Sequence, residues 1–198
     1  FSLAHEIGHI LLDSLTADST SSGIRLRLTT PLPRPARERL CDRVAAELLM
    51  PAEIFRKHLR ALGPSITSLE TLAERFATAI ETTAIRMAQL SDEPCLALRW
   101  QKALRPTWKE AKLYLSWAAA PSGGTSAETY RVVRGTLVRR GSSIFDAYLQ
   151  KKPTAGFESL KLGTRAGRFL TQSKGFGTPP SRFVVSLVFP ERTQNKAA

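Results

Sequence analysis

The chain has 198 residues, of which 42% are hydrophobic and 23% charged, and this composition supports one or two compact domains with a buried core. Its two cysteines form no disulfide framework, which is typical of the reducing cytoplasm. No segment has an apolar run long enough to span a membrane. The formal net charge of +12 indicates an anionic partner or a solubilising surface.

The first predicted element is a helix that begins FSLAHEIGHILL and contains the pattern His-Glu-x-x-His. Residues four apart lie one turn above each other on a helix, so His5 and His9 can place two imidazole nitrogens on one metal ion. Glu6 lies beside the pair, where a carboxylate can take a proton from a metal-bound water and return it to the leaving amine. We expect this helix to be buried because apolar residues occupy most of its sides. The alternative is that both histidines are core or surface residues without a metal.

A second amphipathic helix is predicted over residues 36–51. Glu38 and Asp42 lie four apart on one of its faces, so Glu38 is the candidate third ligand and Asp42 the candidate acceptor for the free N–H of a ligand histidine. The alternative is that both carboxylates are solvated and pair with neighbouring arginines. Cys41 is expected to point elsewhere and to be a small core residue, because catalytic zinc sites with this motif usually keep oxygen and nitrogen ligands.

Together, the two runs resemble the ImmA/IrrE family of metallo-endopeptidases. Residues 38–51 read Glu-x-x-x-Asp-x-Val-Ala-Ala-Glu-Leu-Leu-Met-Pro, where family members carry Glu-x-x-x-Asn/Asp-x-Phe-Ala-Ala-x-Leu-Leu-Met-Pro. Val44 replaces the usual aromatic residue, which is a packing change that leaves the chemistry intact. The resemblance implies a cytoplasmic zinc endopeptidase that cuts a helix-turn-helix transcriptional repressor and so derepresses genes of a mobile element or a stress response.

One zinc ion is therefore the expected cofactor, although imidazole and carboxylate ligands also accept other divalent metals. The third histidine, His58, lies on a polar helical segment beside Arg56 and Lys57, and we expect it to be solvated rather than catalytic. The chain begins at Phe1, four residues before the first candidate ligand, whereas peptidases of this class usually have strands there that align the substrate. We therefore expect the chain to be truncated at its N-terminus.

Two more helices are predicted over residues 66–76 and 80–90, with a short polar break between them that gives a helix-turn-helix appearance. A DNA-recognition helix needs positive contacts. The second helix would present one basic residue among four, namely Glu81, Thr82, Thr83 and Arg86. We therefore favour a structural helical pair that buttresses the metal-binding helices over a DNA-binding element.

The positive charge is concentrated in the second half of the chain. Residues 1–93 hold 11 Lys+Arg and 12 Asp+Glu, whereas residues 94–198 hold 18 and 5, which gives net charges of −1 and +13. The basic half is suited to an acidic protein surface or a nucleic acid, and we expect no membrane contact. The alternative is a solubilising surface, because the basic residues are scattered rather than clustered.

The basic half also has a different pattern of predicted elements. Strands are predicted over residues 95–100, 112–117, 130–138 and 182–189, and one helix over residues 142–151. Residues 121–126 and the Gly-, Thr- and Ser-rich stretch 163–180 are predicted loops. This pattern favours a small α+β domain, and a sensor-like domain as in the radiation-response members of the family is one interpretation.

The predicted fold class is therefore α+β, with two domains. Residues 1–93 form a mainly helical, zincin-like metallopeptidase core, truncated at its N-terminus, with the helix-turn-helix-like extension. Residues 94–198 form the smaller, basic, strand-rich domain. The alternative to an endopeptidase is a DNA- or protein-binding regulatory module that uses the basic half and keeps a regulatory or vestigial metal site.

Overall fold

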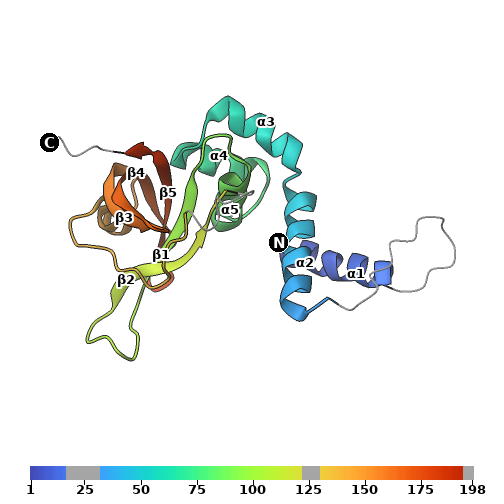
Figure 1. Cartoon of the computed structure of the whole chain (residues 1–198), viewed down its shortest axis with the longest axis horizontal. Helices are drawn as coiled ribbons and strands as arrows, with labels where there is room; N and C mark the ends of the chain where they lie inside the picture. The colour runs from blue at the N-terminus through green and yellow to red at the C-terminus, as the bar shows by residue number, and fades with distance from the viewer. Residues whose placement is uncertain (17–31, 122–129, 194–198) are drawn as a thin grey trace. The chain divides into compact units, whose positions relative to one another are not determined.

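The computed structural model describes residues 1–16, 32–121 and 130–193 and separates into two compact units, Phe1–Phe55 and Arg56–Ala198. The described residues form six helices and one five-stranded antiparallel sheet (Figure 1), which confirms the predicted α+β class. The predicted domain division at residue 93 remains a prediction. In the structure, residues 56–93 belong to the same compact unit as the sheet. Among the described residues, no helix combines the length and hydrophobicity that crossing a bilayer requires.

The first unit contains helices α1 (Ser2–Thr16) and α2 (Arg34–Leu49), which pack against each other, and the beginning of α3 (Ala52–Leu62). Both helices were predicted. Helix α2 begins two residues earlier than expected, because Pro35 is tolerated in a first helical turn, where a backbone N–H is not needed. A further proline, Pro51, follows the end of α2 and prevents its continuation.

Helices α1 and α2 meet through small residues. Ala4 and Gly8 of α1 are buried, as are Cys41 and Ala45 of α2. A Cβ atom added to Gly8 would lie 2.9 Å from the Cα atom of Cys41, so the two backbones approach more closely than any larger residue at position 8 would allow.

The expectation that α1 is buried on most sides was wrong. Its buried stripe is narrow, and several large apolar residues on its other sides are exposed, among them Leu3 at 77% and Ile10 at 67%. The physical reason is that α2 packs along one face of α1, and one helix can cover only one face of another.

The second unit begins with the rest of α3, followed by two helices that were both predicted, α4 (Ile66–Arg75) and α5 (Ile80–Leu90). Helix α4 starts at a serine cap, in which Ser65 Oγ accepts a hydrogen bond of 3.0 Å from the backbone N–H of Ser68. The helices pack against each other and bury Leu72 and Met87 completely, as the spacing of their apolar residues predicted.

The sheet has the strand order β2-β1-β5-β4-β3, and every neighbouring pair is antiparallel. The strands are β1 (Leu96–Ala103), β2 (Lys112–Ala119), β3 (Thr154–Leu162), β4 (Arg165–Phe176) and β5 (Phe183–Thr193). The first and last strands of the chain lie side by side near the middle of the sheet, so the fold depends on pairing between distant segments.

Helix α7 (Ser143–Gln150) covers one face of the sheet, and α4 and α5 cover the other. Neighbouring residues of a strand point to opposite faces. In β4, Lys174 forms an ion pair with Glu70 of α4, whereas a Cβ atom added to the next residue, Gly175, would overlap the carbonyl oxygen of Ala147 in α7. The core between α7 and the sheet consists mainly of large apolar side chains, with the indole of Trp100 only 1% exposed.

Three of the four predicted strands are confirmed as β1, β2 and β5, and the helix predicted over residues 142–151 is confirmed as α7. The strand predicted over residues 130–138 was wrong. Backbone hydrogen bonds and an isolated bridge between Leu137 and Tyr114 hold part of this segment beside β2, but Gly135 adopts a positive φ of 89° that interrupts an extended chain. The predicted loop 163–180 was also wrong, because most of it forms β4. Residues 122–126 of the other predicted loop lie outside the described part of the chain.

Candidate metal centre

The three predicted ligand residues lie close together in the first unit. His5 and His9 are one turn apart on α1, and their ring centroids are 4.9 Å apart. Glu38 on α2 places its Oε2 atom 3.3 Å from Nε2 of His5 and 3.8 Å from Nε2 of His9. A single carboxylate oxygen therefore lies near the Nε2 atoms of both imidazole rings.

The two separations from Glu38 are compatible with a shared tetrahedral zinc ion, although among the described residues the set whose donor atoms all lie within 4.8 Å of one another is His5, His9 and Cys41. With metal–ligand bonds of about 2.1 Å and tetrahedral angles, donor atoms lie about 3.3 to 3.5 Å apart. The two distances from Glu38 Oε2 are equal to or slightly longer than this value. Two imidazole nitrogens and one carboxylate oxygen also leave a fourth position for water or substrate, as in catalytic zinc sites.

Asp42 contacts His5 as the sequence predicted. Its Oδ1 atom lies 2.9 Å from Nδ1 of His5, so it can accept the N–H of that nitrogen. With the proton on Nδ1, the lone pair of Nε2 is free, and this is the nitrogen that faces Glu38. Asp42 therefore sets both the orientation and the protonated nitrogen of the His5 ring.

Cys41 contacts the second histidine, contrary to the expectation that it points elsewhere. The residue is fully buried, and its Sγ atom lies 3.3 Å from Nδ1 of His9. Helical spacing could have revealed this contact, because Cys41 follows Glu38 by three residues and so lies on the same side of α2. Each of the two histidines therefore has its Nδ1 atom held by a residue of α2 while its Nε2 atom is directed toward Glu38.

A different donor set is also compatible with the distances, because one ligand atom from each of His5, His9 and Cys41 lies within 4.8 Å of the others. We favour Glu38 as the third ligand for two reasons. Cys41 approaches His9 at the nitrogen that does not face Glu38. Burial, and to a smaller extent the negative charge of Glu38, also raises the pKa of the Cys41 thiol in the metal-free protein, so the thiol rather than the thiolate is the form present before a metal binds.

Glu6, the predicted general base, is exposed on α1 directly after His5. Among the described residues its carboxylate has no hydrogen bond or ion pair. A carboxylate without a fixed partner can take up and release a proton at the site, which the predicted role requires.

The third histidine, His58, is not close to any described group of metal-ligating residues. Its Nδ1 atom lies 2.8 Å from a guanidinium nitrogen of Arg75, and its ring meets the edge of Phe76 at 6.1 Å. The prediction that His58 is solvated needs correction, since the residue is half-buried within a local contact between α3 and the end of α4.

The residues that a recognition helix would present are largely engaged within the second unit. Glu81 pairs with Arg99 of β1, Thr83 is completely buried, and Arg86 is only 7% exposed. Helix α5 therefore packs on the sheet with these residues, and its role in the described structure is architectural.

Residues 1–88 match the family described as the IrrE N-terminal-like domain, peptidase family M78. The match covers a little under half of the chain and supports an assignment of this part to the ImmA/IrrE family. The radiation response metalloprotease IrrE of Deinococcus radiodurans is 28% identical over 144 residues, which cover 71% of this chain and 40% of that protein. The chain thus spans less than half the length of this relative. A match to a metallopeptidase family implies a metal cofactor, and His5 and His9 lie among the residues that would hold it.

A solved structure of a transcriptional regulator from Mycobacterium tuberculosis has a similar fold, with a TM-score of 0.57 at 16% identity. The similarity covers 94% of this chain and 54% of the regulator. At this level of identity the likeness concerns the fold alone.

Proposed function

We propose that this chain is the catalytic part of a zinc-dependent endopeptidase in which His5, His9 and Glu38 hold one ion. The observation that carries the proposal is the convergence of both Nε2 atoms on one oxygen of Glu38, at 3.3 and 3.8 Å. Residues 1–88 also match a peptidase family, which supports the same reading.

Each polar residue of the site has a defined task in this proposal. When bound, the ion would polarise the carbonyl group of the scissile peptide and activate water for attack. Glu6 accepts the proton of the attacking water and returns it to the leaving amine. Asp42 keeps the proton of His5 on Nδ1, and the contact between Cys41 and His9 does the same for the second ring.

We further propose that the substrate is a helix-turn-helix transcriptional repressor whose cleavage derepresses mobile-element or stress-response genes. This substrate follows from the resemblance of the two motif helices to the ImmA/IrrE family. The relative from Deinococcus radiodurans is named a radiation response metalloprotease, which agrees with a regulatory rather than a digestive peptidase. The acting compartment in this proposal is the cytoplasm.

The metal assignment is tested by elemental analysis of three proteins. The unaltered protein should contain about one zinc per chain. The Glu6→Gln variant should keep the zinc and lose proteolysis, whereas His5→Ala should lose both. Absence of zinc from the unaltered protein after expression with zinc, or full proteolysis by Glu6→Gln, would contradict the proposal.

The substrate assignment needs a separate experiment. A small helix-turn-helix repressor encoded beside this protein should be cut into two defined fragments by the unaltered protein and left intact by Glu6→Gln. Zinc binding without cleavage of that repressor would reject the substrate and leave the metal centre standing.

The positive charge of the second half favours one alternative function, a regulatory module that binds DNA or an acidic protein and keeps a vestigial metal site. Residues 94–198 hold 18 basic and 5 acidic residues. Binding of this kind should weaken steeply with salt and should persist in His5→Ala. The endopeptidase reading instead requires the histidines.

A further inference from the structure

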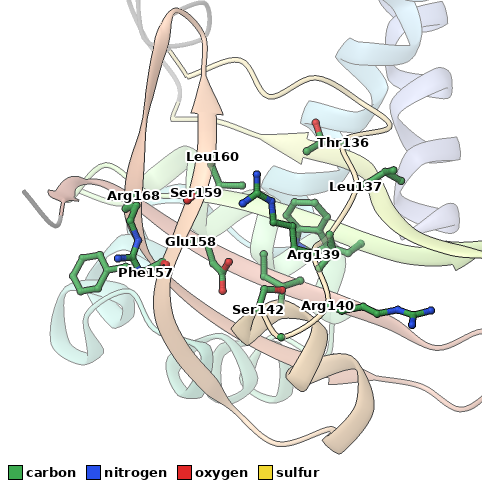
Figure 2. Close-up of a pocket in the computed structure, with 14 residues that line it drawn as sticks. Thr136, Leu137, Arg139, Arg140, Ser142, Phe157, Glu158, Ser159, Leu160 and Arg168 are labelled. Carbon is green, nitrogen blue, oxygen red and sulfur yellow. Dashed lines mark hydrogen bonds between the residues drawn. The ribbon is translucent and has the colours of Figure 1, made fainter. Parts of the chain in front are cut away.

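The second unit contains a cavity of about 340 Å³ on the face of the sheet that α7 covers. Figure 2 shows the residues around it, which come from the loop 136–142, from β3 and from the start of α7. Its volume lies within the range of small-molecule sites. The cavity lies in the part of the chain beyond residues 1–88, and the proposed endopeptidase chemistry makes no use of it.

Part of the cavity wall is apolar and rigid. Trp100, Ile144 and Leu160 contribute to it, and each is at least nine-tenths buried within the core of the second unit. The polar atom of Trp100 is already satisfied, because Nε1 donates a hydrogen bond of 2.9 Å to Ser186 Oγ. Trp100 and Ile144 thus form a rigid support beneath the cavity, and Leu160 is the most accessible of the three for the apolar part of a ligand.

Arg139 brings a positive charge into this space. In Figure 2 its side chain extends from the loop toward Leu160 of β3, whereas the neighbouring Arg140 points away from the cavity. Among the described residues, the guanidinium of Arg139 has no hydrogen bond or ion pair, while Arg140 lies 3.7 Å from Glu110. A free guanidinium presents a planar set of donors that matches a phosphate or a carboxylate.

Glu158, the one acidic residue that lines the cavity, is already hydrogen-bonded within the protein. Glu158 Oε1 accepts hydrogen bonds from the backbone N–H and from the hydroxyl of Ser143, both at 2.7 Å. This places the carboxylate at the first turn of α7, where the positive end of the helix stabilises it. Among the basic residues that line the cavity, Arg140 pairs with Glu110 and Arg168 donates a hydrogen bond of 3.1 Å to the carbonyl oxygen of Phe157. Among the described residues, the guanidinium of the cavity without a protein partner is therefore that of Arg139.

We propose that this cavity binds a small organic anion, with its phosphate or carboxylate group on Arg139 and its apolar part against Leu160. The excess of basic residues in this half of the chain favours the approach of an anion. The cavity is half-open and of limited volume, which favours a small molecule over a nucleic-acid backbone, because the latter needs a long basic groove.

The full chain should be titrated by calorimetry with four ring compounds that differ in one group: phenyl phosphate, benzoate, benzyl alcohol and benzylamine. Phenyl phosphate or benzoate should bind saturably at submillimolar to millimolar concentration, and their relative affinities show which oxyanion is preferred. The neutral alcohol and the cationic amine should not bind measurably.

The two adjacent arginines supply a matched pair of variants, because both are exposed and either substitution removes one positive charge. Arg139→Gln should lower the affinity for the more tightly bound anion about tenfold or more, since a charge-assisted contact is lost. Arg140→Gln should weaken it by about twofold at most, because only a distant, screened charge is removed.

Three results would overturn the proposal. One is the absence of saturable binding by both anions, and another is tighter binding of benzylamine, which would make Glu158 the dominant group. The third is equal weakening in both variants together with tighter binding of a single-stranded oligonucleotide, which would assign the charge to nucleic-acid contact.

Discussion

The two compact units use opposite means to fix their packing. In the first unit, α1 and α2 come close together because Gly8 has no side chain where it faces Cys41. In the second unit, the sheet and α7 are held together by large buried side chains, above all by the indole of Trp100. The polar residues of the candidate metal centre lie in the first unit, where there is little apolar core to hold the helices in place.

This difference teaches that a polar site can be placed by close backbone contact rather than by a large core. His5, His9 and Glu38 converge because two helix axes are close enough for side chains of ordinary length to meet. We therefore expect the second unit to be sensitive to removed volume and the first to added volume.

The largest effect is expected when volume is removed from the second unit. Trp100→Ala should lower the free energy of unfolding by about 3 to 5 kcal/mol, because it leaves a cavity in the core and removes one of the hydrogen bonds of the Ser186 hydroxyl. Denaturant unfolding followed by circular dichroism measures the change. Leu104→Ala, at a residue 63% exposed, is the control and should be nearly neutral. An equal loss of stability in Trp100→Ala and Leu104→Ala would contradict the expected sensitivity of the second unit to removed core volume.

Added volume should damage the first unit. Gly8→Ala places a methyl group 2.9 Å from the Cα atom of Cys41, so the helices must separate, at a cost of about 1 to 3 kcal/mol. Because separation moves Glu38 away from both histidines, zinc content after dialysis should fall sharply. Leu3→Ala changes an exposed position of the same helix and should keep its zinc. Normal zinc binding by Gly8→Ala would show that the close contact is dispensable.

A weaker effect is expected when a supporting residue of the site changes without a change in volume. Asp42→Asn removes the negative charge that holds the His5 proton, and zinc affinity should fall about 10- to 100-fold. Competition with a chromogenic chelator measures the affinity. Glu53→Gln, an exposed carboxylate at the start of α3, provides the control and should bind zinc normally.

A smaller change is predicted for Cys41→Ser, which keeps the size of the side chain and an acceptor for His9. Zinc affinity should change by only a few-fold, since the thiol supports the ring and does not bind the ion. The cobalt-substituted protein distinguishes the two donor sets. A thiolate-to-cobalt charge-transfer band that is lost in Cys41→Ser would identify Cys41 as a ligand and displace Glu38.

The smallest effect concerns surface charge in the second unit. A hydrogen bond from Arg60 lowers the pKa of Asp92 below its ordinary value of 3.8. The folded state thus favours the carboxylate, so this pair stabilises the protein above about pH 4 and its contribution disappears as the pH falls further. Asp92→Asn should slightly flatten the acid side of the stability profile, because both side chains are exposed. A large loss of stability in Asp92→Asn at neutral pH would mean that this surface ion pair contributes as much to the stability of the second unit as its buried side chains do.

The candidate site was largely predictable from the sequence because helical spacing is a local property. The interval of four between His5 and His9, and again between Glu38 and Asp42, was enough to predict the contacts that the structure contains. The role of Cys41 was missed because chemical preference among zinc ligands was given more weight than its position on α2.

The sheet was harder to predict because its buried faces are not uniformly apolar. Strand β4 buries Thr171 and Ser173 and uses Gly175 where α7 comes closest, so its sequence is typical of a loop. Ser173 is satisfied by a hydrogen bond of 2.7 Å to Ser186 on the neighbouring strand, a partner that only the tertiary structure provides. Long-range pairing of this kind leaves no local signal in the sequence.

The close approach at Gly8 also limits how this part of the chain can vary in evolution. The space that a side chain at position 8 would need is taken by backbone and Cβ atoms of Cys41, which cannot move aside as the end of a flexible side chain can. A compensating change would have to shift a whole helix, and that shift would carry Glu38 and Asp42 with it. A saturation library should therefore tolerate almost nothing but glycine at this position, while the exposed neighbour Ile10 accepts many residues.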